Sequence, residues 1–131
     1  MVQAVGMAST NGSTGAIFHI AFERDWQRAL ERGSYEISTR GRTLDEVGFI
    51  HAGFEGQVAA VGSAFYADVP EPLVVLVIDP DQLESRLVVE DVEGSDDAFP
   101  HIYGPLNPSA VVHVYPASVT DDGFAFGDGA S

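Results

Sequence analysis

Residues 73–78 form the most apolar stretch of the sequence, and they constrain the fold more than any other feature. This run, LVVLVI, is bounded by Pro72 on one side and by Asp79 and Pro80 on the other. Its length and branched side chains are typical of a central strand that is buried on both faces. A chain of 131 residues, 45% of them hydrophobic, has enough apolar side chains to cover both faces of such a strand.

Two helices and several shorter strands are expected around this run. The first helix is expected to begin at a cap formed by Asp25 and to end at Gly33. Its apolar face consists of Trp26, Ala29 and Leu30. Five or six strands with two helices grouped early favour the α+β class over a regular alternation of strands and helices. The other expected elements are strands at residues 17–22, 35–38, 48–52, 87–90 and 110–115, a helical turn opened by a Thr43–Glu46 capping box, and a second main helix at residues 55–66.

The composition predicts one folded domain at residues 16–119. Residues 1–15 are small and polar, and residues 120–131 are rich in Gly and Asp, so both are expected to be disordered or flexible. Residues 91–98 are expected to form an acidic loop. Residues 99–106, with two prolines, a histidine and a tyrosine, are expected to be a rigid loop that either lines a pocket or only joins two strands.

The formal charge of −14 excludes some classes of partner. Nucleic acids and anionic membranes both require a surplus of positive charge, so neither is expected to bind. The sequence has no cysteine, which excludes disulfides, thiolate metal sites and cysteine nucleophiles. It has no apolar run of transmembrane length and no signal-peptide pattern in residues 1–15, and we expect a cytoplasmic protein. Arg40 and Arg42 flank a glycine, and this spacing is compatible either with an anion site or with a solvated loop.

Three of the four histidines lie in similar apolar surroundings. His19, His51 and His101 are each next to isoleucine, where an imidazole is costly unless its nitrogens find partners. We therefore expect the three rings to share one cleft. They could hold a metal ion in an open site, or bind a polar ligand and act as a general acid or base.

Several short motifs follow one another along the chain. They are Ile17-Phe18-His19-Ile20, Trp26, Gly33-Ser34-Tyr35, Gly48-Phe49-Ile50-His51, Gln57, Phe65-Tyr66, residues 73–79 and residues 99–106. In this order the motifs resemble the small bacterial family called domain of unknown function 952. The resemblance covers roughly residues 16–116, with Val47 in place of the usual acidic residue and Ala52-Gly53 in place of a frequent Cys-Ser pair.

This resemblance implies a fold like that of ADP-ribosyltransferases and RNA 2′-phosphotransferases, with a mixed, bent and split sheet around an NAD-binding cleft. By position, His19 would bind the ribose, His51 and His101 would complete the catalytic site, and Glu90 is the candidate for the catalytic glutamate. The expected cofactor contacts are Arg40 and Arg42 with the pyrophosphate, Phe49 and Tyr103 with the nicotinamide, and Gln57.

We therefore expect a protein that binds NAD or a related nucleotide, with ADP-ribosyltransferase-like transfer as its activity if it is an enzyme. One alternative is a metal-binding module built on the three histidines. The other is a binding or interaction domain without catalysis. The sequence does not indicate an oligomeric state.

Overall fold

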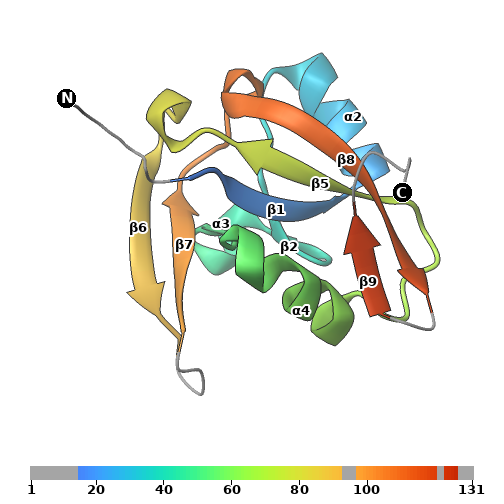
Figure 1. The fold of residues 1–131 in the computed structure, drawn as a ribbon. Coiled ribbons are helices and arrows are strands. Elements are labelled where there is room, and N and C mark those ends of the chain that lie inside the picture. The colour runs from blue at the N-terminus through green and yellow to red at the C-terminus, as the bar shows by residue number, and fades with distance from the viewer. Residues whose placement is uncertain (1–14, 93–96, 121–122, 127–131) are drawn as a thin grey trace.

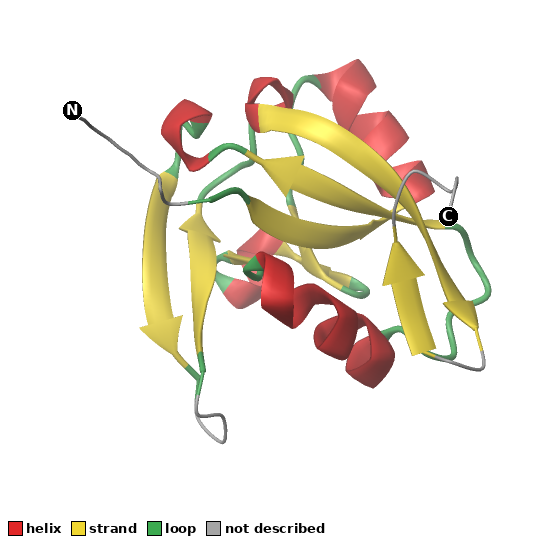
Figure 2. Cartoon of the chain, viewed as in Figure 1, coloured by secondary structure: helices red, strands yellow, loops and turns green. Residues whose placement is uncertain are grey.

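The computed structural model describes residues 15–92, 97–120 and 123–126 (Figure 1). Strands form the centre of the fold, and the helices lie around them (Figure 2). In chain order the elements are β1 (Ile17–Phe22), α2 (Glu23–Arg32), β2 (Ile37–Thr39), β3 (Arg42–Thr43), α3 (Leu44–Val47), β4 (Ile50–His51), α4 (Glu55–Phe65), β5 (Leu73–Ile78), β6 (Arg86–Asp91), β7 (Ala98–Tyr103), β8 (Val111–Thr120) and β9 (Gly123–Phe126). Single 3₁₀ turns at Pro80–Gln82 and Pro108–Ala110 complete the described elements.

The strands form a four-stranded sheet in the order β1-β5-β8-β9, a three-stranded sheet in the order β4-β7-β6, and a small β2-β3 hairpin. Every pairing between these described strands is antiparallel, so the expectation of a mixed sheet is wrong. The reason lies in the path of residues 23–72. They bring the chain back to the end of β1, where Glu23 N–H donates to Pro72 C=O at 3.0 Å, and β5 then runs back along β1.

The two larger sheets meet at Gly53. β4 pairs with β7 through Ile50 and His51, and two residues later the same segment pairs with β1. There, Phe18 N–H donates to Gly53 C=O at 2.7 Å, and Gly53 N–H donates to Phe18 C=O at 2.8 Å. This change of partner bends the sheet and divides it, which confirms the predicted bent, split sheet in an α+β chain.

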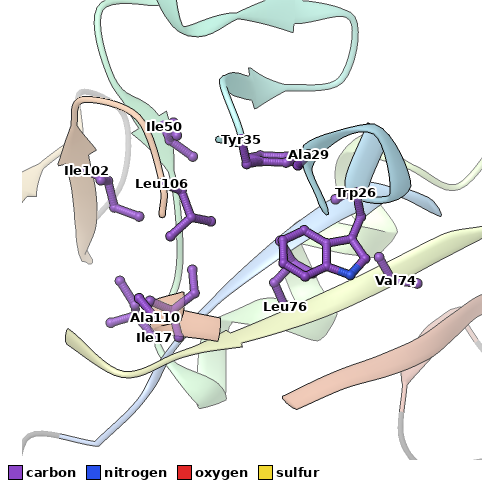
Figure 3. Packing of buried hydrophobic residues seen from close by; sticks show 12 residues of the cluster. Ile17, Trp26, Ala29, Tyr35, Ile50, Val74, Leu76, Ile102, Leu106 and Ala110 are labelled. Carbon is purple, nitrogen blue, oxygen red and sulfur yellow. The ribbon is translucent and has the colours of Figure 1, made fainter. Parts of the chain in front are cut away.

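The prediction for residues 73–78 is confirmed, because β5 is buried along its whole length. Val74, Leu76 and Ile78 belong to one core cluster, and the alternate residues of β5 belong to another. Helix α2 lies on one side of the four-stranded sheet and α4 on the other (Figure 1). Trp26 of α2 packs in the first cluster with Leu76 (Figure 3), and Val58 of α4 packs in the second.

The predicted helices are present, with differences at one of them. Helix α2 ends at Gly33, whose φ of 84° is the left-handed conformation that favours glycine. It begins at Glu23, so Asp25 lies in the first turn instead of capping it, and Leu30 is 50% exposed instead of sharing the buried face. The Thr43–Glu46 capping box is confirmed at α3, and the second main helix is confirmed as α4.

Residues 99–106 are not the predicted loop, because most of them belong to β7, the central strand of the three-stranded sheet. Pro100 is tolerated there for a local reason. Beyond His51 the β4 ladder ends, and Ala52 N–H donates to Pro100 C=O at 3.1 Å. The nitrogen of Pro100 faces the same edge, so the missing N–H costs one bond at the end of a short ladder.

The predicted boundary of the folded domain at residue 119 is also wrong. Residues 123–126 form β9, and Phe124 is buried in the second core cluster against α4. Its ring lies where a Cβ on Gly62 would be, with the nearest ring atom 2.2 Å from that position. Asp91 and Ala98, assigned to an acidic loop, belong instead to β6 and β7. Residues 1–14, 93–96, 121–122 and 127–131 lie outside the described residues, as do the predictions made for them.

Candidate functional site

The outer face of the three-stranded sheet carries most of the predicted site residues. Residues opposite each other in antiparallel strands place their side chains on the same face, and alternate residues of one strand share it too. The register pairs His51 with His101, Val88 with His101, and Arg86 with Tyr103. Ile50 and Ile102 point the other way, into the first core cluster. We call the following set the histidine face: Phe49, His51, Glu90, His101 and Tyr103.

A carboxylate connects two of these side chains. Glu90 Oε1 accepts hydrogen bonds from His101 Nδ1 at 2.8 Å and from the Tyr103 hydroxyl at 2.5 Å. The two bonds, that from Tyr103 first, lower the pKa of the Glu90 carboxyl below its ordinary value. The hydrogen bond between Tyr103 and Glu90 also raises the pKa of the Tyr103 hydroxyl. This hydroxyl therefore stays protonated and donates a hydrogen bond to Glu90.

His101 has one nitrogen without a partner. The residue is only 4% exposed, and its Nε2 is the one buried side-chain nitrogen or oxygen of the described residues that has no hydrogen bond. Because Nδ1–H donates to Glu90, Nε2 of the neutral ring is an acceptor. A buried polar atom without a partner is unfavourable, and such atoms are often sites of function.

Aromatic rings surround His101. The Phe49 ring stacks on it, with centroids 4.1 Å apart and an interplanar angle of 19°. His51 meets His101 edge-on at 5.3 Å, and Tyr103 lies 5.3 Å from Phe49. His51 is exposed, although neighbouring atoms cover part of it. This partial desolvation is the larger cause that lowers the pKa of His51, and the nearby His101 is the smaller cause. The face therefore presents an exposed imidazole and flat aromatic surfaces beside a buried proton acceptor.

His19 does not belong to this surface. It is 3% exposed, its Nδ1 bonds to the His51 carbonyl oxygen at 2.5 Å, and its Nε2 bonds to the Tyr35 hydroxyl at 2.8 Å. Burial lowers the pKa of His19 to about 4, so the ring is neutral at pH 7. The structure thus brings the rings of His51 and His101 together, and it joins His19 to them through a hydrogen bond to the carbonyl of His51.

Of the expected cofactor contacts, Phe49 and Tyr103 lie on the histidine face, whereas Arg40, Arg42 and Gln57 do not belong to it. Arg40 bonds to the Asp68 carboxylate at 2.6 Å and to the Phe65 carbonyl at 3.0 Å. Arg42 is exposed in β3. Gln57 accepts from Phe54 N–H and donates to the Ala98 carbonyl, both at 2.9 Å, so its amide fixes the start of α4 to β7.

Arg86 is the residue that the sequence analysis did not select. It lies opposite Tyr103. Its charge adds a small part to the lowering of the Glu90 pKa, after the bonds from Tyr103 and His101, and offsets a small part of the rise that the bond to Glu90 causes in the Tyr103 pKa. One signal for it was available, because Arg86 is the only basic residue in the acidic second half of the sequence. It gives the histidine face a cation that Arg40 and Arg42 do not supply.

The enclosed space beside this site is small. A cavity of about 40 Å³ is lined by His19, His51 and Tyr66, among others. A larger hollow of about 260 Å³ lies between α2 and the β2–α3 segment, lined by Arg28 and Arg32 among others. Both hollows are smaller than the roughly 300–1,000 Å³ of pockets that hold drug-sized ligands.

A three-histidine metal site is not formed. The described residues contain no group of three or more His, Cys, Asp or Glu side chains placed to hold a metal ion. The geometric reason is that both nitrogens of His19 bond to other protein atoms. The predicted metal-binding alternative is wrong for this part of the chain.

The fold and site define a class of protein: an α+β domain with a bent antiparallel sheet and a histidine-bearing outer face. The family model described as "Protein of unknown function (DUF952)" matches residues 20–114, and the chain belongs to this family. The family resemblance that the sequence motifs indicated is thereby confirmed.

Solved structures with a similar fold include those of the protein CC0527 from Caulobacter crescentus. Its crystal structure is 28% identical, with a TM-score of 0.69, and the match covers 82% of this chain and 90% of that chain. Its solution NMR structure is 26% identical, with a TM-score of 0.63, covering 83% and 90%. A comparison with curated proteins gives no match. None of these findings names an ADP-ribosyltransferase, so the transferase-like fold and the NAD site stay predictions.

No helix in the part of the chain that the structure describes has the length and apolar content to cross a membrane.

Proposed function

We propose that the histidine face binds NAD or a related nucleotide, and that His101 Nε2 accepts a hydrogen bond or a proton from what is bound there. The observation that carries this proposal is the unpartnered Nε2 of a ring that is 4% exposed. Glu90 fixes Nδ1 as the donor, which keeps Nε2 ready to accept. Ring–ring contacts in the face place this atom next to flat surfaces.

A nucleotide suits the chemistry of the surrounding side chains. Aromatic rings stack on bases and on nicotinamide, and Phe49, His51 and Tyr103 offer such rings at or near the surface. Arg86 offers a guanidinium for a phosphate group. The formal charge of −14 favours a small ligand over a nucleic acid, because a long phosphate chain would be repelled by the rest of the surface.

The same groups support a transfer reaction. The bond between nicotinamide nitrogen and ribose C1 would break, with its electron pair going to the nicotinamide nitrogen. An acceptor hydroxyl oxygen would form the new bond to C1, and its proton would go to His101 Nε2. Both hydrogen bonds to Glu90 use Oε1, so the carboxylate can still stabilise the positive charge that develops on the ribose.

Isothermal titration calorimetry with NAD and with ADP-ribose tests the binding. Wild-type protein is expected to bind, and His101→Gln to bind at least ~10-fold more weakly, since a hydrogen bond that contributes about 1.4 kcal/mol corresponds to a factor of ten. His113→Gln is the matched control, because His113 is an exposed histidine on β8 of the other sheet. No heat of binding at millimolar ligand, or equal losses in both variants, would contradict the proposal.

An assay for free nicotinamide separates an enzyme from a binding domain. Release that His101→Gln and Glu90→Gln both abolish supports transfer. Binding without release identifies the chain as a nucleotide-binding domain without catalysis.

A further inference from the structure

The polar residues buried in the described part of the chain all lie at one place. They are His19, Ser38 and His101, and Ser38 is fully buried. His101 belongs to the histidine face. The other two bond to the backbone of the segment that carries Phe49 and His51, where Ser38 Oγ donates to the Phe49 carbonyl and His19 bonds to the His51 carbonyl.

The protons on this chain of bonds follow from the partners. A backbone carbonyl only accepts, so His19 Nδ1 must carry the hydrogen and donate to His51 C=O. Nε2 of the neutral ring then accepts, and Tyr35 must donate its hydroxyl hydrogen to it. Burial raises the pKa of Tyr35, so this hydroxyl stays protonated. The result is one directed path from Tyr35 through His19 to the backbone of His51.

These bonds hold the two residues whose rings complete the histidine face. The ladder of β4 has only two residues, so it orients the segment weakly by itself. The carbonyls of Phe49 and His51 are anchored from the core side by Ser38 and His19, while their rings turn outward and meet each other at 4.8 Å. A displaced carbonyl would move the ring of the same residue.

We propose that Ser38, His19 and Tyr35 are positioning residues, which fix the rings of Phe49 and His51 against His101 by holding the Phe49 and His51 carbonyls. His19 is therefore a positioning residue and not a ligand contact. The importance of this arrangement for a ligand rests on the proposed function, but the positioning itself is measurable in the free protein.

The first test is NMR of the wild-type protein with ¹⁵N-labelled histidine. The ring of His19 is expected to carry its hydrogen on Nδ1, with an unprotonated Nε2, and to stay in that form from pH 8 to about 5.5. The charged or titratable groups that act on the His19–Tyr35 pair are His51, Tyr66 and Asp25. A hydrogen on Nε2, or protonation of His19 near the ordinary value of about 6.5, would overturn the assignment.

The second test uses Tyr35→Phe and Ser38→Ala, with Tyr115→Phe as the control. Tyr115 is a partly buried tyrosine on β8 of the other sheet, and no hydrogen bond joins it to a histidine in the described residues. Tyr35→Phe and Ser38→Ala are expected to weaken the ring–ring NOEs among Phe49, His51 and His101, and to raise the pKa of His51 toward its ordinary value as its ring becomes more exposed. Tyr115→Phe is expected to leave both readouts unchanged.

Folded Tyr35→Phe and Ser38→Ala proteins with unchanged NOEs and an unchanged His51 pKa would overturn the positioning role, as would equal changes in Tyr115→Phe. If either variant fails to fold, the tautomer of wild-type His19 still decides the assignment. All these readouts are taken without ligand. A failure of NAD to bind therefore counts against the proposed function alone.

Discussion

The four-stranded and three-stranded sheets contain similar apolar strands but differ in what covers them. β5 is buried at all six positions, because core clusters that include α2 and α4 cover its two faces. β7 turns Ile102 into the first core cluster and His101 into the histidine face. The apolar side chains that stabilise the fold and the polar side chains of the proposed site therefore lie on separate faces. A strand covered on both sides can hold only apolar or fully bonded residues, whereas a strand with an open face can present reactive groups.

The two buried histidines show the same contrast. His19 lies in the four-stranded sheet and has a partner for each nitrogen. His101 lies in the three-stranded sheet and has a partner for one. The ring of His19 therefore has all its hydrogen-bonding capacity used within the fold, while the buried Nε2 of His101 has capacity that the described residues leave unused.

Truncating a side chain should lower the free energy of unfolding much more in the four-stranded sheet than in the three-stranded sheet. Leu76→Ala removes a fully buried side chain from the centre of β5 and should lower the free energy of unfolding by about 2–5 kcal/mol. Val89→Ala in β6, where the side chain is 53% exposed, should change it by less than about 0.5 kcal/mol. Urea denaturation measures both, and similar losses would mean that the two sheets are not covered differently.

The second effect is the loss of stability in acid that His19 causes. The pKa of His19 is about 4 in the folded chain and 6.5 in the unfolded chain. Between these two pH values the unfolded chain binds a proton at His19 that the folded chain does not bind. This contribution is fully present above pH 6.5, and about 3 kcal/mol of it is lost as the pH falls to 4.

His19→Gln measures this contribution by difference, since the acidic residues titrate in both proteins. The variant is less stable at pH 7, but its stability should fall less steeply than that of the wild type between pH 7 and pH 4.5. Parallel curves would show that His19 is not held neutral.

A third effect tests how the second face of the four-stranded sheet is closed. Gly62→Ala places a methyl group within the Phe124 ring and should cost about 1–3 kcal/mol by overpacking. Gly56→Ala is the control on the same helix, because its Cβ meets open space, and it should stabilise the protein by up to about 1 kcal/mol. If both variants are stabilised, β9 does not pack on α4.

The smallest effect concerns the open face. Tyr103→Phe removes the hydrogen bond that lowers the Glu90 pKa most, so the pKa of Glu90 should rise while the midpoint of thermal unfolding stays unchanged. The ¹³C shift of the Glu90 carboxyl, followed against pH, measures this change. An unchanged Glu90 titration would remove Tyr103 from the network.

The parts of the fold that could be predicted are those that depend on a few neighbouring residues. The apolar run of β5, the Thr43–Glu46 capping box and Gly33 at the end of α2 each act over a few residues. β9 could not be predicted, because Phe124 becomes a core residue only against Gly62 of a distant helix. Pro100 suggested a loop because its place at the end of the β4 ladder depends on tertiary pairing.

The candidate site was predictable in its residue types but not in its geometry. Glu90 was selected by position, and the β6–β7 register is what brings its carboxylate to His101. The sequence gives no sign that His19 bonds inward at both nitrogens. Arg86 was missed because a single arginine has no motif around it.

An NMR titration of the free protein with NAD tests the histidine face most directly. Ring signals of Phe49, His51, His101 and Tyr103 should shift together as ligand is added, with one common dissociation constant. His113 and Tyr115, whose rings pair on β8, should not shift. No shift at millimolar NAD, or shifts confined to β8, would contradict a nucleotide site on the histidine face.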